Sequence, residues 1–141
     1  MSFTGEFRRT IDSKGRLIVP ARMRDELEND EVVLVVGPDG CIEAYSGASW
    51  RDYEQRLLEQ QHSNRTARAV VRRIAASAHS DQVDRQGRLH IPDNLRRWAG
   101  IDRDVVVAGH LRHAEIWSPE RWEGSVPSQD QLAEGFGELQ L

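Results

Sequence analysis

The chain has little that would suit an oxidising compartment or a membrane. Among its 141 residues Cys41 is the single cysteine, so no intrachain disulfide can form, which fits a reducing cytosol. The longest apolar runs, such as VVLVV at 32–36, are strand-sized and far below the roughly 20 residues of a membrane helix. The first ten residues lack the apolar core of a signal peptide. We therefore expect a soluble, cytoplasmic protein without a membrane partner.

Motifs of the common enzyme classes are also missing. The sequence contains no Walker loop and no GxGxxG stretch. Among five scattered histidines only His110 and His113 have the spacing of metal ligands, and no cysteine or carboxylate pattern surrounds them, so we predict no metal site. Glu43 and Glu115 could form a carboxylate pair, although internal salt bridges or subunit contacts explain them better. The sequence therefore predicts no catalytic residues, no cofactor and no small-molecule substrate.

The net charge of −4 argues at first against nucleic acid as a partner. Its distribution argues differently, because residues 1–24 carry six Lys/Arg against two acids, and residues 63–73 carry four Arg and no acid. Residues 25–62 carry ten acids against two Arg, and residues 104–141 carry seven against two. Such runs can be solvated faces only, but a segregated basic surface can also bind phosphate despite an acidic total.

One frame, Asp-x-x-Gly-Arg-Leu-x-x-Pro, occurs twice, as DSKGRLIVP at 12–20 and as DRQGRLHIP at 84–92. A constant offset of 72 residues aligns 11–50 with 83–122 without a gap, so the chain is a tandem duplication. One copy of about 40 residues has too little core to be stable alone. We therefore predict that the two copies pair around a pseudo-twofold axis and complete one β-barrel.

Each copy has the same predicted plan of short strands, a tight turn and a short helix. The turns lie at Gly15 and Gly87, because glycine supplies the positive φ of a tight hairpin. A proline starts each short helix, at 20–28 and 92–100, and Gly100 caps the second. Strands are predicted at 31–36, 41–45, 104–109 and 114–117, and helices at 49–60 and 64–78, with Ser46 and Ser118 as N-caps.

These patterns divide the chain into two half-modules, a helical linker and a tail. The first half-module is assigned to 5–50, the linker to 51–80, the second half-module to 81–124 and the tail to 125–141. Two glycines, Gly135 and Gly137, make a helix in the tail marginal unless it docks on a partner. The arginines of the linker are as well explained by a solvated helix face as by a binding role.

The two arginines of the frame follow a turn, where a guanidinium can reach outward. Arg16 and Arg88 can simply pair with Asp12 and Asp84 to close the turns, or they can bind phosphate or the major-groove edge of guanine. Recurrence of the frame among other basic residues favours DNA, and both roles can hold together. The DNA-binding residues we predict are Arg9, Lys14, Arg16, Arg85 and Arg88. The turn-bracing residues we predict are Asp12, Gly15, Asp84 and Gly87.

The stretches DSKGRLIVPARMRDEL, DRQGRLHIP and VVVAGHLRHAEIWSPERW resemble the MraZ family of bacterial transcriptional regulators, over about residues 3–123. The resemblance implies an α+β, mainly β fold: a duplicated swapped-hairpin, double-psi-like barrel as in the AbrB and SpoVT regulators, with flanking helices. It implies a ring-like homo-oligomer, associated with the nucleoid, that binds short direct repeats in double-stranded DNA upstream of its own division and cell-wall gene cluster. The motif's arginines, here Arg16 and Arg88, would contact that DNA.

One departure from the family pattern is Arg112–His113, where the family commonly carries Asn-Lys, so a subunit contact at this turn would differ in detail. Two alternatives to a promoter-specific regulator stay open. One is an antitoxin or general nucleoid-binding protein of the same fold. The other is a scaffold for protein interactions that uses the acidic surfaces and does not bind DNA.

Overall fold

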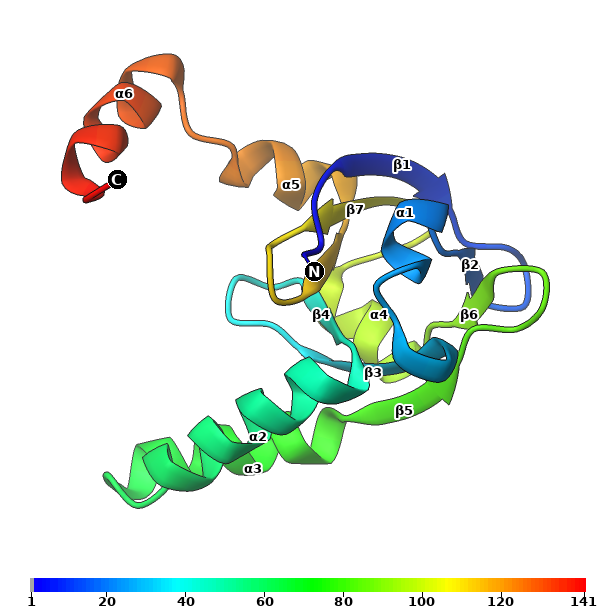
Figure 1. The fold of residues 1–141 in the computed structure, drawn as a ribbon, viewed down its shortest axis with the longest axis horizontal. Helices are drawn as coiled ribbons and strands as arrows, with labels where there is room; N and C mark the ends of the chain where they lie inside the picture. Colours follow the sequence, from blue (N-terminus) through cyan, green and yellow to red (C-terminus); the bar gives the residue numbers. More distant parts are fainter. Residues whose placement is uncertain (1) are drawn as a thin grey trace.

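A computed structural model of the chain describes residues 2–141. The strands are β1 (Glu6–Thr10), β2 (Arg16–Ile18), β3 (Glu31–Val36), β4 (Ile42–Tyr45), β5 (His79–Gln82), β6 (Arg88–His90), β7 (Asp104–Gly109) and β8 (Ala114–Trp117). The helices are α1 (Ala21–Arg24), η1 (Glu28–Asp30, a 3-10 turn), α2 (Gly47–Gln60), α3 (Arg65–Ser77), α4 (Asp93–Ala99), α5 (Pro119–Ser125) and α6 (Gln129–Glu138). Figure 1 shows the strands gathered into one body, from which the α2–α3 hairpin and α6 project.

The strands of the two copies interleave. A six-stranded antiparallel sheet has the order β1-β7-β8-β4-β3-β5, so the first strand of each copy pairs with the third strand of the other. At the centre β4 pairs with β8, and β2 pairs with β6 in a separate two-stranded ribbon. Neither copy closes on its own, which confirms the predicted pseudo-twofold pairing. The fold is the expected α+β, mainly β, swapped-hairpin barrel with flanking helices.

The core explains why two strands are apolar at nearly every position. Leu34 and Val35 on β3, and Val105 and Val106 on β7, are at most 1% exposed. Both faces of β3 are covered, because helices α2, α3 and α4 all contact this strand. A strand buried on both faces needs no polar alternation. The ribbon β2–β6 differs, because only its central leucines, Leu17 and Leu89, point into the core.

The two proline-led helices differ in length, although the sequence predicts them to be alike. Helix α4 ends at Gly100, whose φ is +65°, as predicted. Helix α1 ends at Arg24 rather than near residue 28, because the chain turns through Asn29 and Asp30 at positive φ into β3. Acidic residues 25, 26 and 28 would have lain at the negative end of a longer helix dipole, which is unfavourable.

The hairpin expected at each glycine turn is also altered. Across the first turn only an isolated bridge forms, between Ile11 just after β1 and Leu17 of β2, while β1 pairs along its whole length with β7. The strand after the turn is free to pair with its counterpart from the other copy. Swapping thus replaces two local hairpins with the single β2–β6 ribbon.

The predicted helix caps are confirmed. Ser46 accepts a hydrogen bond from the Ser49 amide and Ser118 from the Arg121 amide, which satisfies amides that have no partner inside their helices. Helix α6 forms in the tail behind a capping box of Ser128 and its N3 residue. Leu132 and Phe136 on this helix, and Leu139 just after it, are exposed. Within residues 2–141 no helix is both long and apolar enough to cross a membrane.

Candidate nucleic-acid interface

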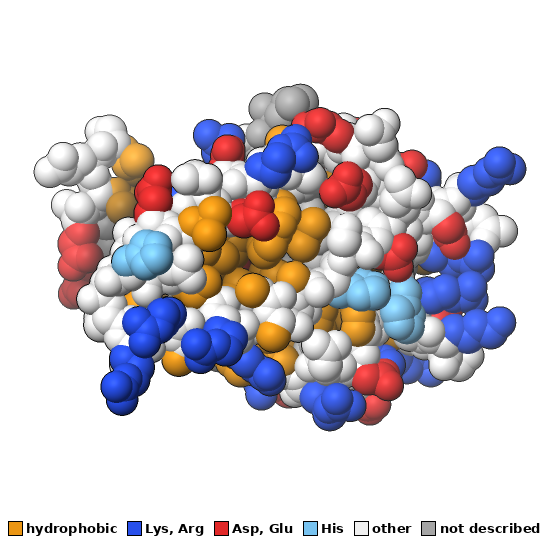
Figure 2. All heavy atoms as spheres, turned by 90° about the horizontal axis from the view of Figure 1, so that it is seen from below, with side chains coloured by type: hydrophobic (Ala, Val, Ile, Leu, Met, Phe, Trp, Pro, Cys, Tyr) orange, Lys and Arg blue, Asp and Glu red, His pale blue; other side chains and the backbone are white. Residues whose placement is uncertain are grey.

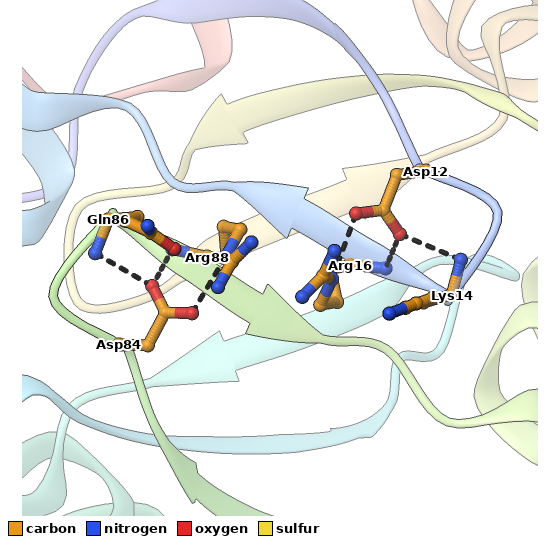
Figure 3. A network of polar contacts seen from close by, with 6 residues as sticks. All are labelled: Asp12, Lys14, Arg16, Asp84, Gln86 and Arg88. Atoms are coloured by element: carbon orange, nitrogen blue, oxygen red, sulfur yellow. Dashed lines mark hydrogen bonds and ion pairs between the residues drawn. The ribbon is translucent and has the colours of Figure 1, made fainter.

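The turn at residues 12–16 is organised by one aspartate. Asp12 Oδ1 accepts hydrogen bonds from the backbone amides of Lys14 and Arg16, both at 2.9 Å. Its Oδ2 accepts the side-chain Nε of Arg16 at 2.9 Å, and its backbone carbonyl accepts the amide of Gly15. One carboxylate therefore fixes both the path of the turn and the direction of the arginine that follows it (Figure 3).

The turn at residues 84–88 repeats this arrangement bond for bond. Asp84 Oδ1 accepts the amides of Gln86 and Arg88 at 2.9 Å, and Oδ2 accepts Arg88 Nε at 2.8 Å. Glycine is needed in both turns, since φ is +79° at Gly15 and +82° at Gly87. In both turns the aspartate accepts hydrogen bonds from amides across the turn, and the glycine adopts the positive φ.

The two turns lie at opposite ends of the β2–β6 ribbon. Arg16 faces His90 and Ile18 faces Arg88 in its register, while the Leu17–Leu89 pair between them points inward. The outward face of the ribbon thus carries two arginines on a diagonal, which for antiparallel neighbours corresponds to a spacing of roughly 7–8 Å. Figure 3 shows both guanidinium groups lying over the ribbon between the two turns. In Figure 1 these turns project together at one end of the molecule.

Each arginine keeps the forked end of its guanidinium free. Only Nε is used by the aspartate, and across residues 2–141 the terminal nitrogens of Arg16 and Arg88 form no hydrogen bond or ion pair. Their side chains are each 30% exposed. A guanidinium held by Nε presents the paired N–H groups that bind phosphate or guanine in bidentate fashion.

Further cations surround the ribbon. Lys14 is exposed in the first turn and Arg85 in the second, so the two turns and the ribbon together carry four cations against Asp12 and Asp84. In Figure 2 Lys and Arg side chains gather at the end that carries these turns, and again at the opposite end of the same face. The local surface is basic although the whole chain is acidic.

Arg9, also predicted to bind DNA, is placed apart from this group. It lies on β1, where its guanidinium packs over the ring of Phe7, 5.5 Å from the centroid, and donates to the Arg8 carbonyl. In the described part of the chain no hydrogen bond or ion pair joins it to either turn. Arg9 is therefore not oriented by the aspartate of either turn, unlike Arg16 and Arg88.

The structure also places residues beside the turns that the sequence did not single out. Arg24 lies beside Gly87, held by two hydrogen bonds to Asp30, and its repeat partner Arg96 lies beside Gly15. Each copy thus supports the turn of the other. In the sequence, the identity of Arg24 and Arg96 in the aligned repeat was the one signal for these residues. Their position beside the turns follows from the exchange of strands between the copies, which the alignment alone does not reveal.

Proton binding to Asp12 and Asp84 should make the stability of the fold depend on pH. Hydrogen bonds from the backbone amide of Arg16 above all, and from its side chain, lower the pKa of Asp12; those of Arg88 lower the pKa of Asp84 likewise. A carboxylate with a lowered folded-state pKa stabilises the fold above its unfolded pKa of about 4, and this contribution is lost as the pH falls through the folded value.

We therefore expect Asp12→Asn/Asp84→Asn to melt a few degrees below the parent protein at pH 7, since asparagine keeps Oδ1 but loses the ion pair. The difference should begin to narrow below about pH 4, where the carboxylates of the unfolded parent take up protons, and should narrow further as the pH falls toward the lowered folded-state pKa. Thermal unfolding followed by circular dichroism from pH 3 to 8 measures this. Asp102→Asn, in the exposed loop before β7, is the matched control and should melt like the parent at every pH. A gap that stayed constant down to pH 3 would contradict the assignment.

Comparison with known proteins agrees with the duplicated architecture. A family model described as "MraZ protein, putative antitoxin-like" matches the chain twice, at residues 2–73 and 74–134. A protein of Lachnoclostridium phytofermentans named "Transcriptional regulator MraZ" is 42% identical over 140 residues, covering 99% of this chain and 98% of that protein. Proteins of the same name from Clostridium botulinum and Moorella thermoacetica are 44% and 45% identical, covering 97% and 86% of this chain and 98% and 84% of their own. The chain belongs to the MraZ family.

Proposed function

We propose that this chain is a DNA-binding transcriptional regulator that acts at the promoter of its own division and cell-wall gene cluster. The observation that carries the proposal is the twice-built turn, in which an aspartate orients an arginine while leaving its forked end free. The relatives, which are named as transcriptional regulators, support the same class. The turns offer a basic surface for double-stranded DNA, with no catalytic step assigned to it.

The ribbon is suited to the major groove. A two-stranded β-ribbon fits into a groove about 12 Å wide, and the arginine fork matches the O6 and N7 acceptors of guanine. In this proposal Arg16 and Arg88 read base edges, while Lys14 and Arg85 in the flanking turns bind phosphates and fix the register. The aspartates raise affinity by holding each fork in its binding direction before DNA arrives, which reduces the entropy lost on binding.

The ribbon is only approximately symmetric, and this favours a directional DNA element. Its arginines obey the pseudo-twofold axis, but Ile18 faces outward where the other copy has His90, and Lys14 stands where the other copy has Gln86. An exactly symmetric ribbon would read a palindrome. Unequal ends match two different half-elements, so one subunit would read an oriented site, and several subunits would read direct repeats.

Several subunits on one DNA would compensate for the small contact surface of each. We propose a ring-like homo-oligomer in the nucleoid, in which neighbouring ribbons engage successive repeats. Binding of a second ribbon would then be intramolecular and strengthened by its effective concentration. A single subunit with one repeat would bind weakly.

A footprint on the DNA upstream of this protein's own gene tests the proposal. We expect protection of spaced, similarly oriented repeats, and affinity that falls steeply with salt. If two to four phosphates per subunit are neutralised, log K should fall by roughly 2 to 4 per tenfold rise in salt for each subunit bound. Fluorescence anisotropy from 50 to 200 mM salt measures the slope.

The other outcomes separate the alternatives. Equal protection of all sequences with the same salt slope would indicate a general nucleoid-binding protein or antitoxin-like activity. A flat salt response, or no retention of DNA, would overturn the proposal and favour a scaffold for protein interactions.

A further inference from the structure

A buried polar cluster lies where the two copies meet at the centre of the large sheet. Glu43 on β4 stands directly opposite Glu115 on β8, and the two are repeat counterparts on the pseudo-twofold axis. His113, just before β8, joins them from the second copy. The glutamates are only 6% and 8% exposed, and they are the only charged side chains among the buried residues of the described chain. The sequence analysis treated the histidine and the glutamates separately; the fold brings them together.

Each glutamate is oriented by an aromatic donor. The hydroxyl of Tyr45 donates to Glu43 Oε1 at 2.9 Å, and the indole N–H of Trp117 donates to Glu115 Oε1 at 3.0 Å. Tyr45 and Trp117 are also repeat counterparts, so the support is symmetric. The remaining oxygens, both Oε2, face the imidazole of His113. Such outer hydrogen bonds are what orient carboxylate ligands in metal sites.

The spacing of the three inward atoms is that of ligands around one ion. His113 Nε2 lies 3.2 Å from Glu43 Oε2 and 3.7 Å from Glu115 Oε2, and one ligand atom from each residue lies within 4.8 Å of the others. Tetrahedral zinc with bonds of about 2.0–2.1 Å places its ligands roughly 3.3 Å apart. The Nε2 atom is fully buried yet has no partner with hydrogen-bond geometry, so it points into the cluster unsatisfied.

The balance of charge among the three side chains also favours a bound cation. Without a metal, the imidazole of His113 lies within ion-pair distance of both carboxylates. An imidazolium together with two carboxylates would carry one net negative charge in the core. A divalent cation bound by a neutral imidazole and two carboxylates would leave none, and buried charge is costly unless compensated.

We propose that Glu43, His113 and Glu115 bind a divalent transition metal of the Zn²⁺ class, which joins the two copies across the β4–β8 pair. An imidazole with two carboxylates suits Zn²⁺ or Mn²⁺, and Zn²⁺ binds such donor sets more tightly. Glu115 also lines an open surface hollow of about 760 Å³, together with His110 and Trp117. The hollow gives the ion a route to the site and a source of water for its fourth ligand.

The site occurs once per chain. The repeat counterpart of His113 is Cys41, which is fully buried in a separate small cluster with Val106 and Trp117. Burial raises the pKa of its thiol, and among the described residues the ligand atoms that converge on the site come from Glu43, His113 and Glu115. We therefore expect a stoichiometry of one ion per chain.

Titration of chelator-treated, full-length protein with Zn²⁺ by calorimetry tests the proposal. We expect one Zn²⁺ per chain and a rise in melting temperature of about 5–10 °C at Zn²⁺ a hundredfold above its Kd. His113→Lys, which keeps a positive charge but removes the imidazole ligand, should weaken binding at least 100-fold, as should Glu43→Gln. His62→Ala, at an exposed histidine beyond α2, should bind like the parent. Mg²⁺, which prefers six oxygen ligands, should not compete.

A measurement on the parent protein keeps the test independent of how the variants fold. Zn²⁺ should shift the ring-nitrogen NMR resonances of His113, and Co²⁺ should give the visible absorption of a four-coordinate site. If Zn²⁺ does not bind, or binds without moving the His113 signals, the cluster is an ion pair only. Binding that survives His113→Lys but is lost in His62→Ala would identify adventitious surface histidines instead.

Discussion

Arg16→Ala should weaken binding to the promoter repeats by about 10- to 100-fold, since a bidentate arginine–base contact contributes roughly 1–3 kcal/mol. The double variant Arg16→Ala/Arg88→Ala removes both forks from every ribbon. We expect its affinity to fall to that of non-specific binding, because an oligomer that engages several repeats loses the contact at each one. The effect should exceed that of any substitution in the flanking turns.

Two controls separate the fork from the charge. Arg16→Lys keeps a cation at the same place but cannot form the paired hydrogen bonds, so it should lose discrimination between repeat and mutated repeat while retaining salt-dependent binding. Arg65→Ala removes an exposed arginine from the start of α3, away from the ribbon, and should bind like the parent. Fluorescence anisotropy with the repeat and with a mutated repeat, over one range of salt concentrations, compares the four variants with the parent. Full affinity of Arg16→Ala would mean that the ribbon is not the DNA-binding surface.

Most of the fold could be predicted from the repeat in the sequence. Two copies too small to be stable alone predicted a shared barrel, and the structure confirms it through the pairing of β1 with β7 and of β5 with β3. The glycine and aspartate of each turn were predictable because their role is local: positive φ and hydrogen bonds to amides within four residues. Features of this kind need no knowledge of distant partners.

Features that depend on the swap were not predictable. The outward face of the ribbon joins residues about 70 positions apart, so the pairing of Arg16 with His90 follows only from the register. The same is true of Arg24 beside Gly87, and of His113 between Glu43 and Glu115. Periodicity indicates which side of a strand is buried, but it does not tell which strand lies next to it.

The ribbon's inward face should matter for folding as strongly as its outward face matters for DNA. Leu17 and Leu89 face each other in the register and are 2% and 3% exposed. Leu17→Ala would remove buried methyl groups where two strands from different copies meet. Substitutions of this kind lower the free energy of unfolding by about 2–5 kcal/mol. This is a large fraction of the roughly 5–15 kcal/mol that stabilises a domain of ordinary size.

The neighbouring residue on the same strand is the matched control. Ile18 is 48% exposed on the other face, so Ile18→Ala should change the free energy of unfolding by less than about 1 kcal/mol. Urea unfolding with an unchanged m-value measures both variants. Leu17→Ala, kept at a temperature where it is folded, should still bind the repeats with its arginines in place, whereas Arg16→Ala should lose little stability and bind the repeats about 10- to 100-fold more weakly. If Leu17→Ala and Ile18→Ala were equally destabilising, the ribbon would not have one face in the core and one face in solvent. The assignment of its solvent face to DNA binding would then be wrong.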